Sequence, residues 1–292
     1  MKRRANLRLC RFSVVAVLGL LAAACTTNSG TVASDQAMAS DTLDSDAEAE
    51  EIGESVELGL QWVEHAAEYR ALTRQAYGVA TRALPELIAD HSWSAMPEQQ
   101  DAGSLPPAVI LDVDETVVSN VGFQLSLKPP FANWKLDEWA RNSEATPIEG
   151  AREFVEAARA LGVSVFFVTN RPCEPRPGIS DPCPQRQTTI DDIEEVGIPT
   201  DAAHVLLSEE RGWTREKLSR RLYIAQNYRV IMLIGDDYGD FVPCTRKKVA
   251  APCTQPGTRA SRAAALEKYR DYWGQGWYIL PNPMHGSWTT VE

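Results

Sequence analysis

The chain has 292 residues, of which 44% are hydrophobic and 24% are charged, and its net charge is −11. This composition predicts a folded globular body, large enough for one large domain or for one domain with a small helical companion. The negative charge argues against a nucleic-acid polymer as a partner, because proteins bind such polymers by neutralising phosphates with Lys and Arg. The sequence leaves the oligomeric state unknown.

Residues 1–24 have the pattern of an export signal. Five basic residues precede the apolar run SVVAVLGLLAAA, which is short for a membrane-spanning helix and fits the apolar region of a signal peptide. An uncleaved N-terminal anchor is the alternative. LLAAAC resembles a bacterial lipobox, although Ala22 stands where Leu is usual, so Cys25 is the expected lipidation site. These features predict an exported bacterial lipoprotein, anchored in a membrane by its lipid and facing the periplasm or the cell surface.

The next two segments differ in their pattern. Residues 25–52 are polar and acidic and are expected to form a flexible tether. In residues 53–106, apolar side chains recur every three or four positions, which predicts a helical segment with one face in the core. The members of this apolar stripe are Leu58, Trp62, Ala66, Tyr69, Leu72, Tyr77, Ala80, Leu84 and Leu87.

In residues 107–292, short apolar runs alternate with helical patterns, and a helical insertion is expected at about 120–147. The runs predict strands at 108–113, 163–168, 203–207, 229–234 and 277–280. The patterns between them predict helices at 148–161, 184–197, 214–228 and 261–273. This alternation indicates an α/β fold with a parallel sheet covered on both faces. Ligands of such sheets bind beyond the carboxyl ends of the strands.

Four cysteines remain after the signal and the lipidation site. The spacing of Cys173, Cys183, Cys244 and Cys253 differs from the short Cys-x-x-Cys spacing of zinc sites. Exported proteins reach an oxidising compartment, where an even number of cysteines favours disulfides. Two local bonds, Cys173–Cys183 and Cys244–Cys253, are the simplest of the three possible pairings.

Polar side chains gather where the predicted strands end. They are Asp112, Asp114, Thr169, Asn170, Asp236 and Asp240, together with Lys217 in the helix that leads to the fourth strand. Taken singly, each also fits a turn, a helix cap or a surface position. Together, acids, a hydroxyl and an ammonium suit a divalent metal and a phosphate, and Mg²⁺ prefers hard oxygen ligands. Asp112 and Asp236 would supply carboxylates, and a backbone carbonyl near Asp114 would complete the ligands from the protein.

Four short motifs carry a resemblance to a known family. D-V-D-E-T, V-T-N-R, Lys217 with Arg220 and Arg221, and G-D-D-Y-G-D-F resemble the motifs of the haloacid dehalogenase superfamily. From about Gln61 to the end, the chain is similar to its class C (subfamily IIIB) bacterial acid phosphatases, which are exported lipoproteins. The resemblance implies a Rossmann-like sheet with a smaller helical domain, Mg²⁺ dependence, and hydrolysis of phosphomonoesters that include 5′-nucleotides.

The resemblance also implies a role for each site residue. Asp112 matches the nucleophile that forms an aspartyl-phosphate, and Asp114 matches the acid and base that serves the leaving group and water. The expected phosphate contacts are Thr169, Asn170 and Lys217. The expected metal ligands are Asp112, Asp114 and Asp236, with Asp240 supporting them from behind.

The leaving-group pocket departs from the family pattern. Phe123 keeps an aromatic ring at one of its two positions, and His285 stands where Tyr is usual. We expect both to line the pocket and the preference for nucleotides to be weakened, although His285 also fits an ordinary surface position. Two alternatives stay open: phosphotransfer to an alcohol through the same intermediate, and a non-catalytic surface binding lipoprotein with this fold.

Overall fold

The structure of the protein is a computed structural model that describes residues 57–142 and 144–291. The predicted signal segment, the tether and Cys25 lie outside these residues. Among the helices of the described part, none is long and apolar enough to cross a membrane.

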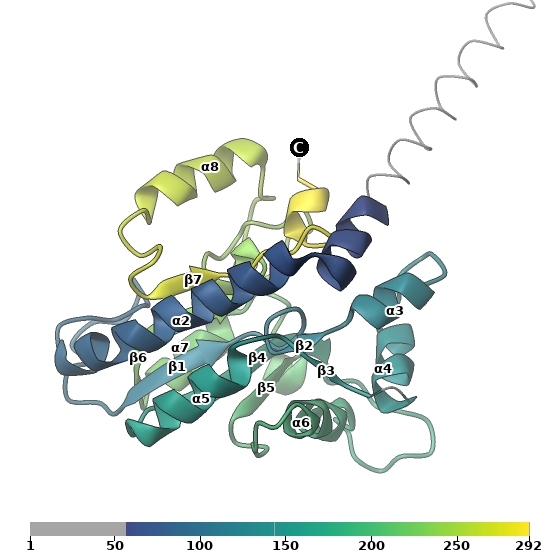
Figure 1. The fold of residues 1–292 in the computed structure, drawn as a ribbon, viewed down its shortest axis with the longest axis horizontal. Helices are drawn as coiled ribbons and strands as arrows, with labels where there is room; N and C mark the ends of the chain where they lie inside the picture. The colour runs from purple at the N-terminus through teal and green to yellow at the C-terminus, as the bar shows by residue number, and fades with distance from the viewer. Residues whose placement is uncertain (1–56, 143, 292) are drawn as a thin grey trace, which may run out of the picture. The chain divides into compact units, whose positions relative to one another are not determined.

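A five-stranded parallel sheet forms the centre of the described part. Its strands are β1 (Pro107–Leu111), β4 (Ser164–Pro172), β5 (Val205–Ser208), β6 (Arg229–Gly235) and β7 (Trp277–Ile279). They are arranged in the order β5-β4-β1-β6-β7, and every neighbouring pair is parallel (Figure 1). The predicted α/β fold with a parallel sheet is confirmed, and the first strand lies at its centre.

Side chains of the central strand alternate between two apolar cores. Val109 and Leu111 lie in one core and Ala108 and Ile110 in the other, as the two-residue period of a strand requires. Helices α2 (Ala67–Ala89), α5 (Ala151–Ala160) and α6 (Gln185–Glu195) contribute buried residues to the first core. Helix α7 (Leu218–Ala225) contributes to the second. Because both faces are covered, the strands are apolar throughout rather than alternating with polar residues.

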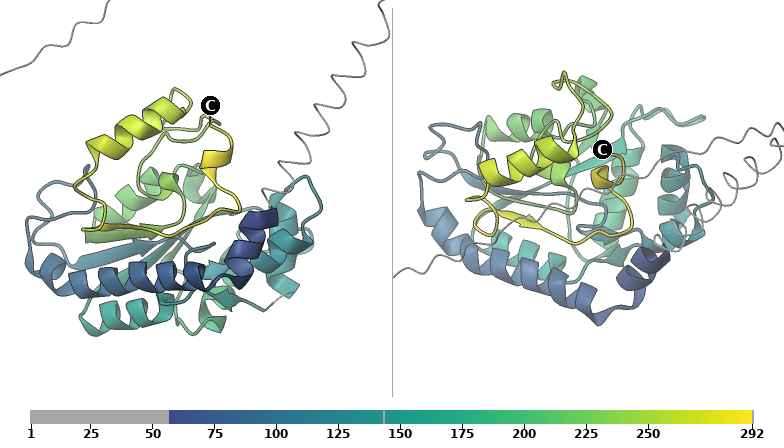
Figure 2. Two further views of the ribbon diagram at one scale, coloured as in Figure 1. Left: turned by 45° about the horizontal axis from the view of Figure 1, so that its top comes forward. Right: turned by 90° about the horizontal axis from the view of Figure 1, so that it is seen from above.

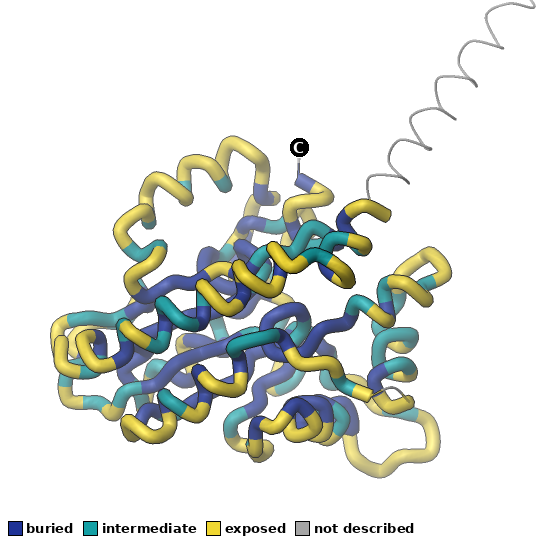
Figure 3. Tube along the Cα trace, in the orientation of Figure 1, coloured by how far each residue is buried: buried dark blue, intermediate teal, exposed yellow. Residues whose placement is uncertain are grey.

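Figure 2 shows α2 and α5 on one side of the sheet and α8 (Arg259–Lys268) on the other. No side chain of α8 is buried, and Figure 3 shows this helix largely exposed, in contrast to the buried strands.

The N-terminal helical segment is divided in two. A helix over 57–65 ends before Ala66, whose backbone is extended, and α2 follows. Most of the predicted apolar stripe is buried or partly buried, but Leu58 is 60% exposed and Leu72 is 42% exposed, so their predicted burial is wrong. Thr73 occupies the buried position beside Leu72, because the buried face continues from Tyr69 to Tyr77 at four-residue steps.

An insertion follows β1. Strand β2 (Val118–Ser119) pairs antiparallel with β3 (Thr146–Pro147), and α3 (Val121–Ser126) and α4 (Asn133–Asn142) lie between them in the chain. The pairing of β2 with β3 holds the two ends of the insertion together, shortly after β1 ends.

Three single-turn helices, η1 (Glu210–Gly212), η2 (Tyr238–Asp240) and η3 (Ser287–Thr289), lie in the connections after β5, β6 and β7. Two disulfides join Cys173 to Cys183 and Cys244 to Cys253, which is the predicted pairing.

Two element boundaries differ from the sequence prediction near the site. Strand β4 continues to Pro172 instead of ending at 168, because Pro172 still pairs with Ser208 of β5. Thr169 and Asn170 therefore lie within the strand and not after it. Helix α7 begins at Leu218, so Lys217 is the residue that precedes its first turn.

Candidate active site

Asp112 is the first residue after β1, at the centre of the sheet. Its backbone N–H donates to the carbonyl of Ile234 in β6 at 2.9 Å, which places it beside the end of that strand. The carbonyl of Val113 then accepts from the N–H groups of Thr116, Val117 and Val118, so the chain turns sharply just beyond Asp112. The parallel pairing thus brings the acidic segments after β1 and β6 to one edge of the sheet.

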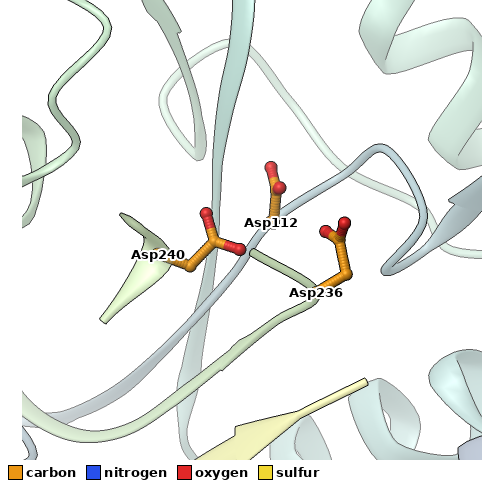
Figure 4. A group of neighbouring side chains, drawn as sticks. All are labelled: Asp112, Asp236 and Asp240. Atoms are coloured by element: carbon orange, nitrogen blue, oxygen red, sulfur yellow. The ribbon is translucent and has the colours of Figure 1, made fainter. Parts of the chain in front are cut away.

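Three carboxylates meet at this edge. One oxygen each from Asp112, Asp236 and Asp240 lie within 4.8 Å of one another (Figure 4). Burial, followed by the charges of Asp240 and Asp112, raises the pKa of Asp236 well above its usual value. Burial also raises the pKa of Asp112 to about 7, although Lys217 acts in the opposite direction. Buried acids that repel one another are costly without a cation, and their hard oxygens suit a divalent metal.

Gly235 at the end of β6 allows Asp240 to reach the cluster. A Cβ at Gly235 would lie 2.6 Å from the Cβ of Asp240, which is closer than two carbon atoms can approach. Asp240 Oδ2 accepts the N–H of Asp237 at 2.9 Å, so the turn after β6 folds its carboxylate back onto the strand end. The sequence predicted that Asp240 supports the site from behind. The structure places its carboxylate within the cluster.

A Gly235→Ala substitution is therefore expected to displace Asp240 and to lower kcat/KM by at least about tenfold, since small displacements at an active site are costly. Gly78→Ala is the matched control, because an added Cβ there meets no atom closer than 3.5 Å. Steady-state kinetics of both variants checks this result, and equal activities of the two would contradict the argued close contact.

Lys217 is a buried cation between two of the carboxylates. Its side chain is 3% exposed, and its Nζ lies 2.5 Å from Asp112 Oδ1 and 2.6 Å from Asp240 Oδ1. Burial alone would lower its pKa, but Asp112 and Asp240 outweigh that effect and raise it. Lys217 thus stays charged between Asp112 and Asp240.

Two buried arginines of α7 hold the surrounding segments in place. Arg220 donates to the carbonyl of Thr169 and, at 2.8 Å, to Asn170 Oδ1. Arg221 donates to the carbonyl of Asp240 and, at 2.9 Å, to that of Phe241. Arg220 thereby fixes the side chain of Asn170, and the phosphate contact predicted for Asn170 would come from a donor such as its Nδ2.

Four hydrogen-bond donors, which belong to three residues, stabilise the ionised form of Asp114. Arg171 reaches its Oδ1 with Nη2 at 2.8 Å and Nε at 3.0 Å, and Asn120 Nδ2 donates to the same oxygen at 2.8 Å. Thr169 Oγ1 donates to Oδ2 at 3.1 Å. Although burial favours the protonated form, Arg171 and these hydrogen bonds hold the pKa of Asp114 below its usual value.

This arrangement bears on the roles predicted for Asp114. An ionised carboxylate can accept a proton from water directly, whereas donation to a leaving group requires that Asp114 first be protonated. Its side chain pairs with Arg171 and is not among the three clustered carboxylates of the described residues. The expected metal contact here is a backbone carbonyl near Asp114. Both the acid and the ligand role stay predictions.

Sequence reasoning missed Arg171. This buried side chain also contacts Asp192 Oδ2 of α6 at 2.5 Å, so it links Asp114 to a helix beside the sheet. The signal was present in the V-T-N-R motif, where an arginine follows two expected phosphate contacts close to a strand end.

The two expected leaving-group residues lie in different surroundings. Phe123 is buried in the insertion, with its ring centre 6.2 Å from that of Phe131 and 5.9 Å from that of Trp139. His285 is 40% exposed, and its Nε2 lies 3.0 Å from Glu115 Oε2. Burial opposes protonation of His285, but Glu115 outweighs it and raises the pKa of His285. Lining of the leaving-group pocket by Phe123 and His285 stays a prediction.

Asn282 is a further contact that sequence reasoning missed. Its Nδ2 donates to Asp236 Oδ2 at 2.8 Å, and its Oδ1 accepts the N–H groups of Met284 and His285 at 3.0 and 3.3 Å. Asn282 therefore fixes the loop that carries His285 against the carboxylate cluster.

Comparisons with known proteins agree with this geometry. Residues 20–288 match the family model of the HAD superfamily, subfamily IIIB (Acid phosphatase). The fold is similar to that of the class C acid phosphatase from Bacillus anthracis, with a TM-score of 0.64 and 25% identity over 80% of this chain and 86% of that chain. A structure of the Bacillus anthracis enzyme with tungstate bound matches with the same values. The chain belongs to the HAD subfamily IIIB acid phosphatases and is a phosphomonoesterase.

Proposed function

We propose that the protein is a Mg²⁺-dependent acid phosphatase that hydrolyses phosphomonoesters through an aspartyl-phosphate on Asp112. The hydrogen bonding of this residue carries the proposal. Its Oδ1 is occupied by Lys217 at 2.5 Å and by the N–H of Val113 at 2.7 Å. In the described residues, its Oδ2 has no hydrogen-bond partner, so this oxygen is left free to attack phosphorus.

The reaction then follows from the residues around Asp112. Oδ2 attacks phosphorus, the bond to the leaving oxygen breaks, and that oxygen takes a proton from the protonated form of Asp114. In the second step, water attacks the acyl phosphate, Asp114 accepts a proton from it, and Asp112 is regenerated with release of phosphate. The Lys217 ammonium and the Thr169 hydroxyl lie beside the two acids and would contact the phosphoryl oxygens as their charge changes.

A Mg²⁺ ion fits the carboxylate cluster. Asp112 and Asp236, with a backbone carbonyl near Asp114, would hold it, and Asp240 lies in the same cluster. The raised pKa of Asp236 reflects a buried negative charge that a cation would stabilise. When bound, Mg²⁺ supplies positive charge that offsets the repulsion between these carboxylates and a phosphate dianion.

Chelation is expected to abolish phosphate release, and added Mg²⁺ to restore it, across a panel of a 5′-nucleotide, an aryl phosphate and an alkyl phosphate. Mg²⁺ should also raise the melting temperature of the chelated wild type but not that of Asp236→Asn, because a ligand that binds only the folded state stabilises it. Activity that survives exhaustive chelation would contradict the metal site.

Two observations support the proposed substrates. The Bacillus anthracis enzyme was solved with tungstate, an oxyanion, which supports an oxyanion site in the same fold here. The resemblance to class C acid phosphatases supports 5′-nucleotides among the substrates, and the nucleotide in the panel tests that assignment.

We also propose that the protein acts outside the cytoplasm as a membrane-anchored lipoprotein. The N-terminal sequence supports export, and the two disulfides fit an oxidising compartment. Cys25→Ser is expected to move the protein out of the membrane fraction, as measured by fractionation and immunoblotting. Unchanged membrane association would instead indicate a retained N-terminal helix.

A further inference from the structure

Two arginines beside the site have no part in the chemistry above. Arg215 precedes Lys217 by two residues, and Arg246 lies in the loop that the Cys244–Cys253 disulfide closes. Positive side chains in this place need an explanation, because the chain as a whole carries a net charge of −11.

The segments that carry these arginines lie side by side. Thr214 Oγ1 donates to the carbonyl of Ala251 at 2.6 Å, and the N–H of Cys244 donates to Glu216 Oε2 at 3.0 Å. Glu216 is buried, so the second contact is protected from water. Arg215 and Arg246 are thus each within two residues of a contact that joins the two segments.

Both segments are also joined to the edge of the sheet where the site lies. Arg220 Nη2 reaches the carbonyl of Arg215 at 3.4 Å and Asn170 Oδ1 at 2.8 Å, so Arg215 is connected to β4. Arg246 Nη2 lies 3.1 Å from Asp237 Oδ1, and Asp237 follows the cluster residue Asp236 directly.

The guanidinium of Arg246 lies at this edge of the sheet, and only one of its nitrogen atoms has a hydrogen-bond partner among the described residues. A Cβ at Gly239 would lie 2.9 Å from its Nη2 and 3.2 Å from its Nε, which places the group over the turn after β6. Asp237 engages only Nη2, and no partner of Nη1 is found in the described residues. The side chain is 21% exposed, so a ligand can still reach it.

Arg215 is exposed and unpaired. Its side chain makes no hydrogen bond or ion pair within 57–142 and 144–291. Partial desolvation of the guanidinium, followed by the positive charge of Arg246, lowers its pKa, while Glu209, Asp114 and Asp237 act in the opposite direction. The contacts of Thr214 with Ala251 and of Cys244 with Glu216 hold the segments of Arg215 and Arg246 together, and no carboxylate of the described residues pairs with Arg215. An anion would be stabilised at such a place.

We propose that Arg215 and Arg246 bind a second anionic group of the substrate, so that the enzyme prefers phosphomonoesters whose leaving group carries a carboxylate or a further phosphate. Guanidinium groups suit both anions, because their planar donors match two oxygens at once. The inference rests on the proposed function, since it concerns the leaving group of the ester that Asp112 attacks.

Three esters that each release a single phosphate test this proposal: 2-hydroxyethyl phosphate, phosphoglycolate and 2-phosphonoethyl phosphate. The leaving group of the first is neutral, that of the second carries a carboxylate, and that of the third carries a phosphonate that cannot be hydrolysed. For one or both charged esters, the wild-type enzyme with Mg²⁺ is expected to have a kcat/KM at least about tenfold higher than for the neutral ester. A gain of this size is typical of one charge-assisted hydrogen bond. The better of the two identifies the anion.

Arg215→Gln and Arg246→Gln are expected to lower the ratio of kcat/KM between charged and neutral esters towards one. The ratio is the readout, because a general loss of activity changes all three esters alike. Arg259→Gln, at the exposed start of α8, is the matched control and should keep the wild-type ratio. Thermal melting confirms that each variant is folded.

Three results would overturn the proposal. A wild-type ratio near one would show that the leaving-group charge is not recognised, and a ratio unchanged in both Gln variants would show that other residues recognise it. Equal losses for all three esters in both Gln variants would place the two arginines on the transferred phosphate instead. These three outcomes leave phosphomonoester hydrolysis intact, whereas a wild type that cleaves none of the esters would overturn the proposed function together with this inference.

Discussion

The Asp112→Asn variant is expected to lose more than about 10³-fold in kcat, as is typical when a covalent nucleophile is removed. An amide lacks the free, negatively charged oxygen that Asp112 Oδ2 offers to phosphorus. The fold should persist, because the amide oxygen can still accept from Lys217 and from the N–H of Val113, as Oδ1 does now. Lys217 also keeps its ion pair with Asp240 in this variant, so the buried ammonium is not left without a carboxylate.

Steady-state kinetics with a fixed Mg²⁺ concentration, together with thermal melting, checks this expectation. Asp271→Asn is the matched control, because the Asp271 side chain is 91% exposed and pairs with the neighbouring exposed Arg270. A folded Asp112→Asn enzyme that turns over at a rate near that of the control would rule out the covalent route.

The Lys217→Met variant is expected to be about 3–5 kcal/mol less stable and to lose activity as well, because it breaks a buried ion pair and leaves charges without a partner. Met nearly fills the volume of the Lys side chain, so the loss reports the charge rather than a cavity. Asp112 and Asp240 would then face each other without the ammonium that lies 2.5 and 2.6 Å from them.

Urea denaturation of Lys217→Met without divalent metal measures this loss. Lys268→Met on exposed α8 is the control and should change stability by less than about 0.5 kcal/mol. The double variant Lys217→Met/Asp240→Asn should recover part of the stability, because one of the two unpaired acids is gone. If Lys217→Met is as stable as the wild type, the ammonium does not hold this cluster together.

The sequence predicted the sheet and the acids of the site because both depend on local patterns. Apolar runs that alternate with helical patterns require a parallel sheet, and parallel strands place their carboxyl ends at one edge. Asp112 and Asp236 were therefore expected to meet, and their carboxylates do lie together.

The remaining features depend on contacts between distant segments. The charged stretch T-R-E-K-L-S-R-R is typical of an exposed helix start, yet Lys217, Arg220 and Arg221 are buried because acids and carbonyls of other segments pair with them. The V-T-N-R motif placed Arg171 near a strand end, but its contact with Asp114 joins positions 57 residues apart and appears only in the folded chain. The pairing of His285 with Glu115 likewise joins positions 170 residues apart, which no periodicity reveals.

Trapping of the phosphorylated enzyme tests the central claim most directly. Wild-type protein with Mg²⁺ is mixed with a phosphomonoester labelled on phosphorus, quenched in acid after milliseconds, digested, and mapped by mass spectrometry. The account predicts a phosphate on the peptide that contains Asp112, released by hydroxylamine as an acyl phosphate is, and no label in Asp112→Asn. Label on another residue, or rapid product formation with no labelled protein at any time, would contradict it.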